Sequence, residues 1–235
     1  MRVSSASSSP AVPAYLRETY SWAYLTPRAV WVFERQWLVN LILWGQFARL
    51  RDAVLDALAP ARAGKVLQVA CVYGDFTPCL LRQQSPGGQL TVVDVAPIQL
   101  ENLARKLGAD ASRTGHVQWH IQDATALQLP DASQQAVVLF FLLHEQPDAV
   151  RRQTLSEAWR VLQPGGQLVV VDYHRPAAWH PLRWLMTPVL RWLEPFALDL
   201  WHHPVVHWLP SHAQPARTEH HTWLAGLYQR VVFTR

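Results

Sequence analysis

Short apolar runs rich in Val and Leu alternate with amphipathic stretches through the middle of this 235-residue chain. The runs with a strand-like pattern are residues 66–70, 90–94, 117–121, 136–142, 167–173 and 228–234. The stretches with a helical pattern among them are residues 76–84, 98–107 and 148–162. Strands and helices that alternate in this way predict an α/β fold, with a mostly parallel sheet and helices on both of its faces.

Three further segments flank or interrupt this α/β core. Residues 1–13 are rich in Ser, Ala and Pro and are expected to form a disordered tail, although a mitochondrial presequence would have a similar composition. Residues 14–60 have a helical pattern with a wide apolar face and predict an N-terminal helical cap on a domain spanning residues 61–235. Within that domain, residues 174–221 are rich in Pro, Trp and His, and we interpret them as an insertion that faces the substrate or a membrane.

The basic side chains are concentrated at the two ends of the chain. Residues 1–65 carry 8 basic and 4 acidic side chains, residues 174–235 carry 6 and 3, and residues 66–173 carry 7 and 10. With 12 Trp in the chain, this pattern favours an anionic lipid surface over nucleic acid as the partner. Only two of the 21 basic residues are Lys, so a coding bias toward Arg explains the excess equally well.

The expected location follows from the apolar segments and the cysteines. The most apolar run, Trp37 to Trp44, is far shorter than a bilayer-spanning helix, so we expect a peripheral membrane protein. Two cysteines, Cys71 and Cys79, exclude a disulfide framework or a four-Cys metal site and fit a reducing compartment. We expect the cytoplasmic side of a bacterial inner membrane, with the matrix side of a mitochondrial inner membrane as the alternative.

Several polar residues follow the predicted strands directly. In an open parallel sheet, ligands bind beyond the carboxyl ends of the strands, near the point where the strand order reverses. Asp94 closes the second strand, where a carboxylate can accept the two ribose hydroxyls of an adenosine or, alternatively, cap the next helix. Asp123 ends the third strand, where it can accept the exocyclic amine of adenine or serve as a turn residue.

Residues 157–172 contain the most specific signal of the fold. Their sequence places Pro164, Gly165 and Gly166 between a helix and the fifth strand, and glycines there permit a tight reversal. Together with Asp94, Asp123 and the loop at residues 66–77, this segment resembles the class I S-adenosylmethionine-dependent methyltransferases. The resemblance implies a Rossmann-like class I methyltransferase fold.

A narrower resemblance extends from about residue 14 to the end of the chain. Val-Tyr-Gly-Asp-Phe at 72–76, Phe-Glu-Arg-Gln-Trp-Leu-Val-Asn at 33–40 and Asp-Tyr-His-Arg-Pro at 172–176 are similar to the rhodoquinone-biosynthesis family, a divergent relative of the ubiquinone and menaquinone methyltransferases. The resemblance implies conversion of ubiquinone to rhodoquinone, in which an amino group replaces a ring methoxy group. It also implies that S-adenosylmethionine is the amino donor and that manganese supports the reaction.

The resemblance implies a set of cofactor-binding residues, and the chain departs from the usual pattern at three of them. Methyltransferases usually have an acidic residue where this chain has Gln68, and glycines where it has Ala70 and Val72. The full set of expected cofactor-binding residues is Gln68, Ala70, Val72, Gly74, Asp94, Val95, Gln122, Asp123 and Ala124.

The neutral side chain at position 68 suggests an altered use of the cofactor. A carboxylate there would hold the cofactor's ammonium and raise its pKa, whereas Gln68 leaves the amine easier to deprotonate and more nucleophilic. We therefore hypothesise that Gln68 permits attack by nitrogen on the quinone carbon that bears the methoxy group.

Five residues near the expected reaction site are candidates for catalysis. Tyr73 can stack on the sulfonium or the quinone, or pack in the core. Asp75 can act as a general base, bind manganese together with Glu145 or Asp172, or cap the helix that follows it. The remaining three candidates are His144, Glu145 and Tyr173. His144 can transfer a proton near neutral pH or merely fill space.

His203 and His207 have the spacing of a metal pair on a helix, but Pro204 interrupts that helix, so an interfacial role is the stronger expectation.

Three functions stay open at this stage: amination of ubiquinone, methylation of a quinone or another lipid, and a non-catalytic subunit of a quinone-synthesis complex. The metal ligands and the oligomeric state also stay open.

Overall fold

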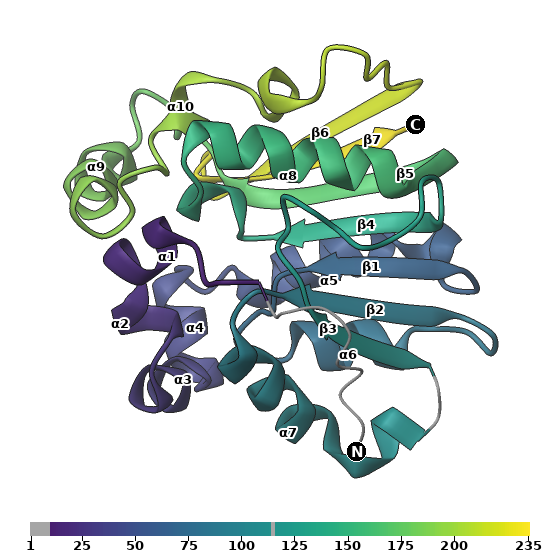
Figure 1. Cartoon of the computed structure of the whole chain (residues 1–235). Coiled ribbons are helices and arrows are strands. Elements are labelled where there is room, and N and C mark those ends of the chain that lie inside the picture. The colour runs from purple at the N-terminus through teal and green to yellow at the C-terminus, as the bar shows by residue number, and fades with distance from the viewer. Residues whose placement is uncertain (1–9, 114–115) are drawn as a thin grey trace.

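The computed structural model describes residues 10–113 and 116–235, and it contains one seven-stranded sheet with helices on both faces (Figure 1). The strand order is β3-β2-β1-β4-β5-β7-β6. Strands β1 to β5 are parallel, while β7 runs antiparallel to both β5 and β6. The prediction of a mostly parallel α/β sheet is therefore confirmed.

The strands lie close to the apolar runs that predicted them. Their bounds are β1 Lys65–Val69, β2 Gln89–Asp94, β3 Val117–Ile121, β4 Gln134–Phe140, β5 Leu162–Tyr173, β6 Arg217–Trp223 and β7 Tyr228–Thr234. The strand order reverses between β1 and β4, so the carboxyl ends of these two strands flank the position where α/β sheets bind ligands.

Two apolar clusters cover the two faces of the sheet. On one face Val66, Val92 and Val138 pack with helices α5 (Phe47–Ala57) and α6 (Phe76–Arg82). On the other face the alternate strand residues, among them Leu67 and Val137, pack with helix α8 (Asp148–Val161). The alternation of side chains along each strand thus supplies both layers of the core.

The predicted helical cap consists of short helices that lie at the carboxyl ends of the strands (Figure 1). They are α1 Ala14–Thr19, α2 Ser21–Tyr24, α3 Pro27–Phe33 and α4 Gln36–Ile42, followed by α5 and the 3₁₀ turn η1 Ala59–Ala61. Thr26 begins α3 as its N-cap, since its Oγ1 accepts a hydrogen bond from the backbone N–H of Ala29.

The segment predicted as an insertion contains helices and, unexpectedly, an edge strand. It forms α9 Pro181–Leu193, α10 Asp199–His202 and η3 Val205–Trp208. The remaining elements, α7 Pro97–Arg113 and η2 Leu143–Glu145, lie earlier in the chain. The last residues of the predicted insertion begin β6, whose sequence lacks the apolar alternation of a buried strand because β6 lies at the edge of the sheet and is largely exposed.

The Pro-Gly-Gly segment is part of the extended run of β5 rather than a separate turn before it. Gln134 pairs with Leu162 and Ala136 pairs with Gln167, so the extra residues of β5 are accommodated as an irregularity in the register. Gly165 has a φ of 76°, and a Cβ on Gly166 would stand 2.8 Å from the carbonyl oxygen of Gln135. The glycines are therefore needed, as predicted, for local backbone geometry.

Candidate active site

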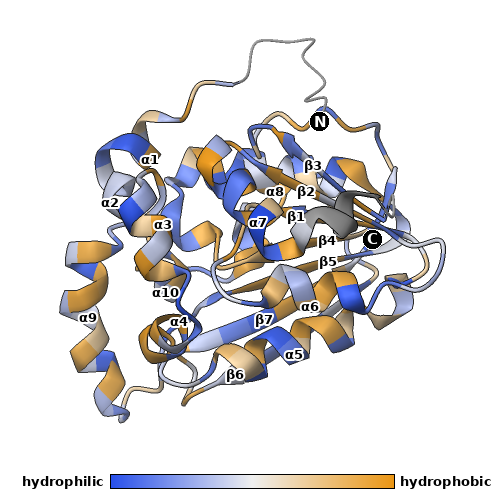
Figure 2. Cartoon of the chain, turned by 90° about the horizontal axis from the view of Figure 1, so that it is seen from below, coloured by the Kyte–Doolittle hydropathy of each residue, from blue (hydrophilic) through white to orange (hydrophobic). Residues whose placement is uncertain are grey.

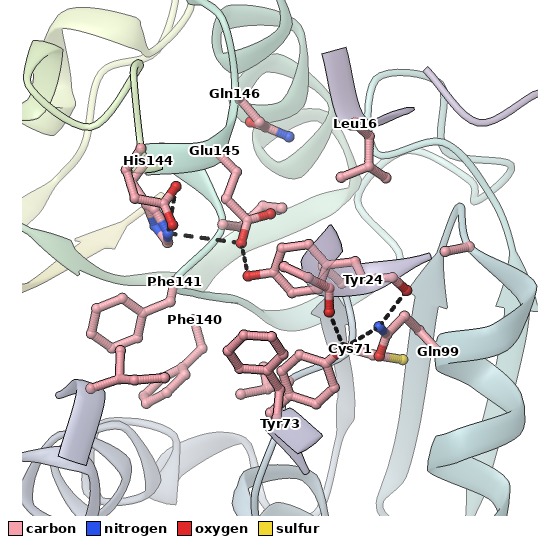
Figure 3. Close-up of a pocket in the computed structure, with 18 of the residues that line it drawn as sticks. Leu16, Tyr24, Cys71, Tyr73, Gln99, Phe140, Phe141, His144, Glu145 and Gln146 are labelled. Atoms are coloured by element: carbon pink, nitrogen blue, oxygen red, sulfur yellow. Dashed lines mark hydrogen bonds and ion pairs between the residues drawn. The ribbon is translucent and has the colours of Figure 1, made fainter. Parts of the chain in front are cut away.

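A cavity of about 670 Å³ lies at the carboxyl edge of the sheet, under the N-terminal helices and beside α9 (Figure 3). Its walls come from the ends of β1, β2, β4 and β5, from helices α1 to α4, and from the inner side of α9. Eleven of the residues predicted to bind cofactor or to act in catalysis line it: Ala70, Val72, Tyr73, Asp94, Val95, Gln122, Asp123, Ala124, His144, Glu145 and Tyr173.

Asp94 is held at one end of this cavity by backbone donors. Its Oδ2 accepts the N–H of Cys71 at 2.7 Å, and its Oδ1 accepts the N–H of Ala96 at 2.8 Å. Burial raises the pKa of Asp94 to about 6, although these hydrogen bonds counteract the shift. Each oxygen has a further lone pair, so the ionised side chain can still accept the hydroxyls of a ribose.

Asp123 closes the neighbouring wall in a turn. Its Oδ1 accepts both the N–H and the hydroxyl of Thr125 at 2.8 Å, which is the turn role considered as the alternative. The side chain nevertheless lines the cavity together with Gln122 and Ala124. Val95 lines the same cavity, so apolar and polar side chains that could contact an adenine ring are present there.

The loop after β1 contains a residue with a Cβ in a backbone conformation that favours glycine. Ala70 adopts a φ of 69°, a left-handed conformation that costs energy for any residue with a Cβ. Val72 projects into the cavity wall, and Tyr73 donates a hydrogen bond to the carbonyl of Ala23 at 2.7 Å. The Tyr73 ring also stacks on Tyr24 at 5.7 Å, so this residue ties the cofactor loop to the N-terminal helices.

Three of the predicted residues, Gln68, Gly74 and Asp75, do not line the cavity, and their predicted roles stay predictions. Gln68 is fully buried: its Nε2 donates to the carbonyl of Ala70 at 2.9 Å, and its Oε1 accepts from Thr77 Oγ1 at 3.0 Å. Gly74 contributes backbone geometry, with a φ of 80° and with Gln36 2.8 Å from the place of a Cβ.

Asp75 is the third residue outside the cavity lining. Its Oδ2 forms a 2.6 Å ion pair with Arg51, and its side chain makes no capping hydrogen bond to helix α6. The roles predicted for it, as a general base or as a metal ligand with Glu145 or Asp172, stay predictions.

A cluster of ionisable side chains forms the deep polar wall of the cavity (Figure 3). His144 Nδ1 lies 2.9 Å from Oδ1 of the fully buried Asp172. Asp172 also accepts backbone N–H groups from Leu143, His144 and Tyr173. Burial alone would lower the pKa of His144, but the charge and hydrogen bond of Asp172 outweigh it and raise the pKa to about 9.

Two carboxyl groups face the other nitrogen of this imidazole. Glu145 Oε1 stands 3.8 Å from His144 Nε2, and Glu194 Oε2 stands 3.9 Å from it, both beyond hydrogen-bond distance. Burial raises the pKa of Glu145 to about 8 and also raises that of Glu194. The raised pKa values of His144 and Glu145 favour the protonated forms of both groups near neutral pH.

Aromatic side chains complete the walls near this cluster. The hydroxyl of Tyr24 donates a hydrogen bond to Glu145 Oε1, and Gln99 Nε2 donates to the carbonyl of Tyr24 at 2.9 Å. Tyr173 presents its ring to His144 edge-on, with centroids 5.0 Å apart. These contacts close the cavity beneath helix α2 and separate His144 from bulk water.

Two of the functional candidates were missed at the level of sequence. Glu194 follows α9 and is the only acidic residue between Tyr173 and Asp199, a signal that the sequence contained. Tyr24 lies 121 residues before its partner Glu145, and no spacing rule relates two such distant positions.

The resemblance also implies manganese, and the described residues show no preformed set of ligands for it. Across residues 10–113 and 116–235, no group of three or more His, Cys, Asp or Glu side chains is placed to hold a metal ion. His203 and His207 stack with ring centroids 4.4 Å apart, and His207 Nε2 lies 2.9 Å from Arg152. The oxygens of Asp172 are occupied by the contacts described above.

Comparisons with known proteins agree with this architecture. A family model described as a methyltransferase domain matches residues 66–166. Among solved structures, the N-methyltransferase NodS from Bradyrhizobium japonicum with S-adenosyl-L-homocysteine is similar with a TM-score of 0.56 and 17% identity, covering 80% of this chain and 86% of that one. The S-adenosylmethionine-dependent methyltransferase SibL is similar with a TM-score of 0.59 and 22% identity, covering 83% and 57%.

The chain is also similar in sequence to methyltransferases of quinone biosynthesis. The chain is 29% identical over 156 residues to the ubiquinone/menaquinone biosynthesis C-methyltransferase UbiE of Cereibacter sphaeroides, covering 66% of this chain and 57% of the relative. It is 32% identical over 139 residues to the demethylmenaquinone methyltransferase of Thermus thermophilus, covering 59% and 60%. The chain thus spans somewhat more than half the length of these relatives.

The fold and the site together define the class of this protein: it has the Rossmann-like class I methyltransferase fold, with the cavity at the expected switch point of the sheet. Within that class, more than half of the chain is similar in sequence to proteins named as quinone methyltransferases. The residues present fit S-adenosylmethionine, since Asp94 could accept the ribose hydroxyls and Val95, Asp123 and Ala124 line the same cavity.

Proposed function

We propose that this protein uses S-adenosylmethionine to replace a ring methoxy group of ubiquinone by an amino group, giving rhodoquinone. One observation carries the proposal: a single cavity extends from Asp94, through the buried His144 and Glu145, to apolar walls formed by α9. Such a cavity suits a nucleoside cofactor at one end and a lipid with a polar head at the other. The similarity to proteins named as quinone methyltransferases supports a quinone as that lipid.

The substrate end of the cavity combines an apolar channel with a polar wall. Met186 and Leu190 of α9 line the cavity together with Phe141 and Leu142 after β4, and these side chains suit the ring and the first units of a polyprenyl tail. His144 and Tyr173 lie where the oxygens of the ring would enter. The tail then leads outward between α4 and α9, both of which contribute to the cavity.

His144 activates the ring in this proposal. In the part of the chain that the structure describes, the Nδ1 of His144 is held by Asp172, while the Nε2 faces the cavity with no acceptor at hydrogen-bond distance. Because the imidazole is protonated, this Nε2–H donates to a quinone carbonyl oxygen. The hydrogen bond draws electron density from the ring and makes the carbon that bears the methoxy group more electrophilic.

Glu145 handles the proton that the exchange requires. S-adenosylmethionine, when bound, supplies the amino nitrogen as the nucleophile. The nitrogen bonds to the ring carbon while the carbon–oxygen bond to the methoxy group breaks. To leave a primary amine, the bond between this nitrogen and the α-carbon of the donor must also break. The ring would accept the two electrons and become the aminoquinol, while the α-carbon would lose its proton and be hydrolysed by water to a 2-oxo acid. Protonated Glu145 gives its proton to the departing methoxide, which leaves as methanol, and the resulting carboxylate recovers a proton from the nitrogen. The pKa of about 8 suits both steps near neutral pH.

Amination in place of methylation is supported by the character of the first strand. Gln68 gives β1 no carboxylate, and its two polar atoms bond Ala70 and Thr77 within the protein. The amine of the cofactor is then not held as an ammonium ion by that strand. A second candidate function is methyl transfer to a quinone ring, which is favoured by the similarity to proteins named as C-methyltransferases.

Incubation with S-adenosylmethionine and a short-tailed ubiquinone, followed by mass spectrometry of the quinone, tests the proposal. Replacement of methoxy by amino supports it. Addition of a methyl group supports the second candidate and contradicts amination. Binding of S-adenosylmethionine without any change in the quinone contradicts both and favours a non-catalytic subunit.

A further inference from the structure

Two helices present large apolar side chains to the surroundings instead of to the core. On α9, Trp184 is 73% exposed and Trp192 is 88% exposed, and Leu185, Val189 and Leu193 share that surface. On α3 and α4, the exposed set is Trp31, Trp37, Leu41 and Ile42, continued by Trp44 just beyond α4. We call these two surfaces the α9 patch and the α3–α4 patch.

The two patches lie at one end of the molecule and border the same cavity. Leu41, Ile42 and Trp44 from one patch and Val189 and Leu193 from the other are among the residues that line it. Figures 1 and 2 both place α9 and the helices α2 to α4 at the same end, and Figure 2 shows the largely apolar character of α9. The outer sides of both helices thus form the rim of the cavity that the proposed quinone enters.

Cationic side chains accompany the aromatic ones. Helix α9 carries Arg183 and Arg191 and no acidic residue, and Arg191 is exposed. In the other patch, Arg35 lies over the ring of Trp31 at 3.9 Å, and the one acid there, Glu34, is engaged by Lys106 at 2.9 Å. Both patches therefore offer cations to an anionic partner, and neither α9 nor the α3–α4 patch has a carboxylate that would repel it.

We propose that the α9 patch and the α3–α4 patch dock together on an anionic phospholipid bilayer, with the cavity mouth open to the acyl layer. Trp and Arg side chains on one surface match the boundary between headgroups and hydrocarbon, where aromatic rings settle and cations meet lipid phosphates. None of the helices in residues 10–113 and 116–235 is long and apolar enough to cross a bilayer. The 13 residues of α9 extend about 20 Å, so this helix lies in the plane of the interface.

Docking gives the cavity direct access to a lipid substrate. A polyprenyl quinone can pass from the acyl layer between α4 and α9 without crossing water. This delivery rests on the proposed function, whereas the docking itself does not require it. The predicted location on the cytoplasmic side of a bacterial inner membrane agrees with an anionic lipid surface.

Flotation of the full chain with vesicles tests the docking. Vesicles of phosphatidylcholine with phosphatidylglycerol are compared with vesicles of phosphatidylcholine alone, at low and high salt. Strong binding is expected to the anionic vesicles, and the double variant Trp184→Ser/Trp192→Ser is expected to lower the partition coefficient by at least about tenfold. The double variant Arg183→Gln/Arg191→Gln is expected to lower it about tenfold for anionic vesicles only.

The control variant is Val206→Ser, which removes an exposed apolar side chain on η3, outside both patches. It must bind like the unaltered protein. Equal binding of the Trp184→Ser/Trp192→Ser variant, or no binding of the unaltered chain to anionic vesicles, overturns the proposal. Self-association that the same Trp variant abolishes, without vesicle binding, identifies a second copy as the occupant and also overturns it.

A separate assay keeps the docking and the proposed function apart. Neither Trp184 nor Trp192 lines the cavity, so turnover of a short-tailed quinone in solution is expected to be the same in the double variant and the unaltered protein. Vesicle binding without quinone turnover contradicts the proposed function alone. Turnover without vesicle binding contradicts the docking alone.

Discussion

Replacing Glu145 by Gln is expected to halve the pH dependence of the free energy of unfolding between about pH 6.5 and 8. In the folded protein the pKa of Glu145 is about 8 and that of His144 is about 9, against ordinary values of 4.5 and 6.5. Both pKa values are raised, so both groups stabilise the fold at low pH, and the stabilisation is lost as the pH rises through the folded-state values.

The magnitude follows from the number of protons bound in each state. Near the middle of this window the folded state holds most of a proton on each group, whereas the unfolded state holds little on His144 and almost none on Glu145. Each proton contributes a slope of roughly 1 kcal/mol per pH unit, so the free energy of unfolding falls by roughly 2 kcal/mol per unit. Glu145→Gln removes one proton and leaves a slope of roughly 1 kcal/mol per unit. Over the window the variant gains roughly 1 to 2 kcal/mol relative to the unaltered protein.

Urea denaturation at a series of pH values, followed by tryptophan fluorescence and extrapolated to water, measures this slope. Gln has the size of a protonated Glu145 and no charge, so the variant preserves the cavity below pH 8. The matched control is Glu101→Gln, which removes an exposed carboxylate from α7 and must retain the slope of the unaltered protein. Equal slopes for Glu145→Gln and the unaltered protein would refute the assignment of a buried, protonated Glu145.

Three further substitutions test the site by activity and binding. Asp94→Asn is expected to weaken S-adenosylmethionine binding by about tenfold to a hundredfold in calorimetry, because the amide cannot replace every charged acceptor bond; unchanged affinity contradicts the ribose role. His144→Asn is expected to lower kcat for the quinone by about 10² to 10⁴ with cofactor affinity preserved, and an unaffected kcat would refute ring activation. Gln68→Glu is expected to depress amination more than cofactor binding. The control is Thr77→Val, which breaks the same buried hydrogen bond without adding charge. Equal turnover in Gln68→Glu and the unaltered protein contradicts the role proposed for the neutral side chain of Gln68.

The general position of the site could be predicted from the sequence, because the pattern of apolar residues identifies the strands whose ends form it. Runs of apolar residues identified β1, β2 and β4, and the carboxyl ends of parallel strands meet at one edge. Asp94 ends β2 and Glu145 lies in η2 after β4, so both were expected near a ligand, and both line the cavity. Local pattern is enough here because the sheet itself brings the strand ends together.

The orientation of individual side chains could not be predicted in this way. Gln68 and Asp75 have the right sequence positions for cofactor chemistry, yet a buried hydrogen bond to Thr77 and an ion pair with Arg51 hold them outside the cavity. These partners come from α5 and α6, and their positions depend on how the helices pack on the sheet. Glu194 was likewise missed, because it reaches the site only through the placement of α9.

The most direct test of the account uses S-adenosylmethionine labelled with ¹⁵N in its amino group and with deuterium in its methyl group. The labelled compound is incubated with the protein and a short-tailed ubiquinone, and the quinone is then examined by mass spectrometry. The account predicts a product that has lost a methoxy group and gained ¹⁵N without deuterium. A quinone that retains its methoxy groups and carries deuterium would contradict the account and assign methyl transfer to this cavity.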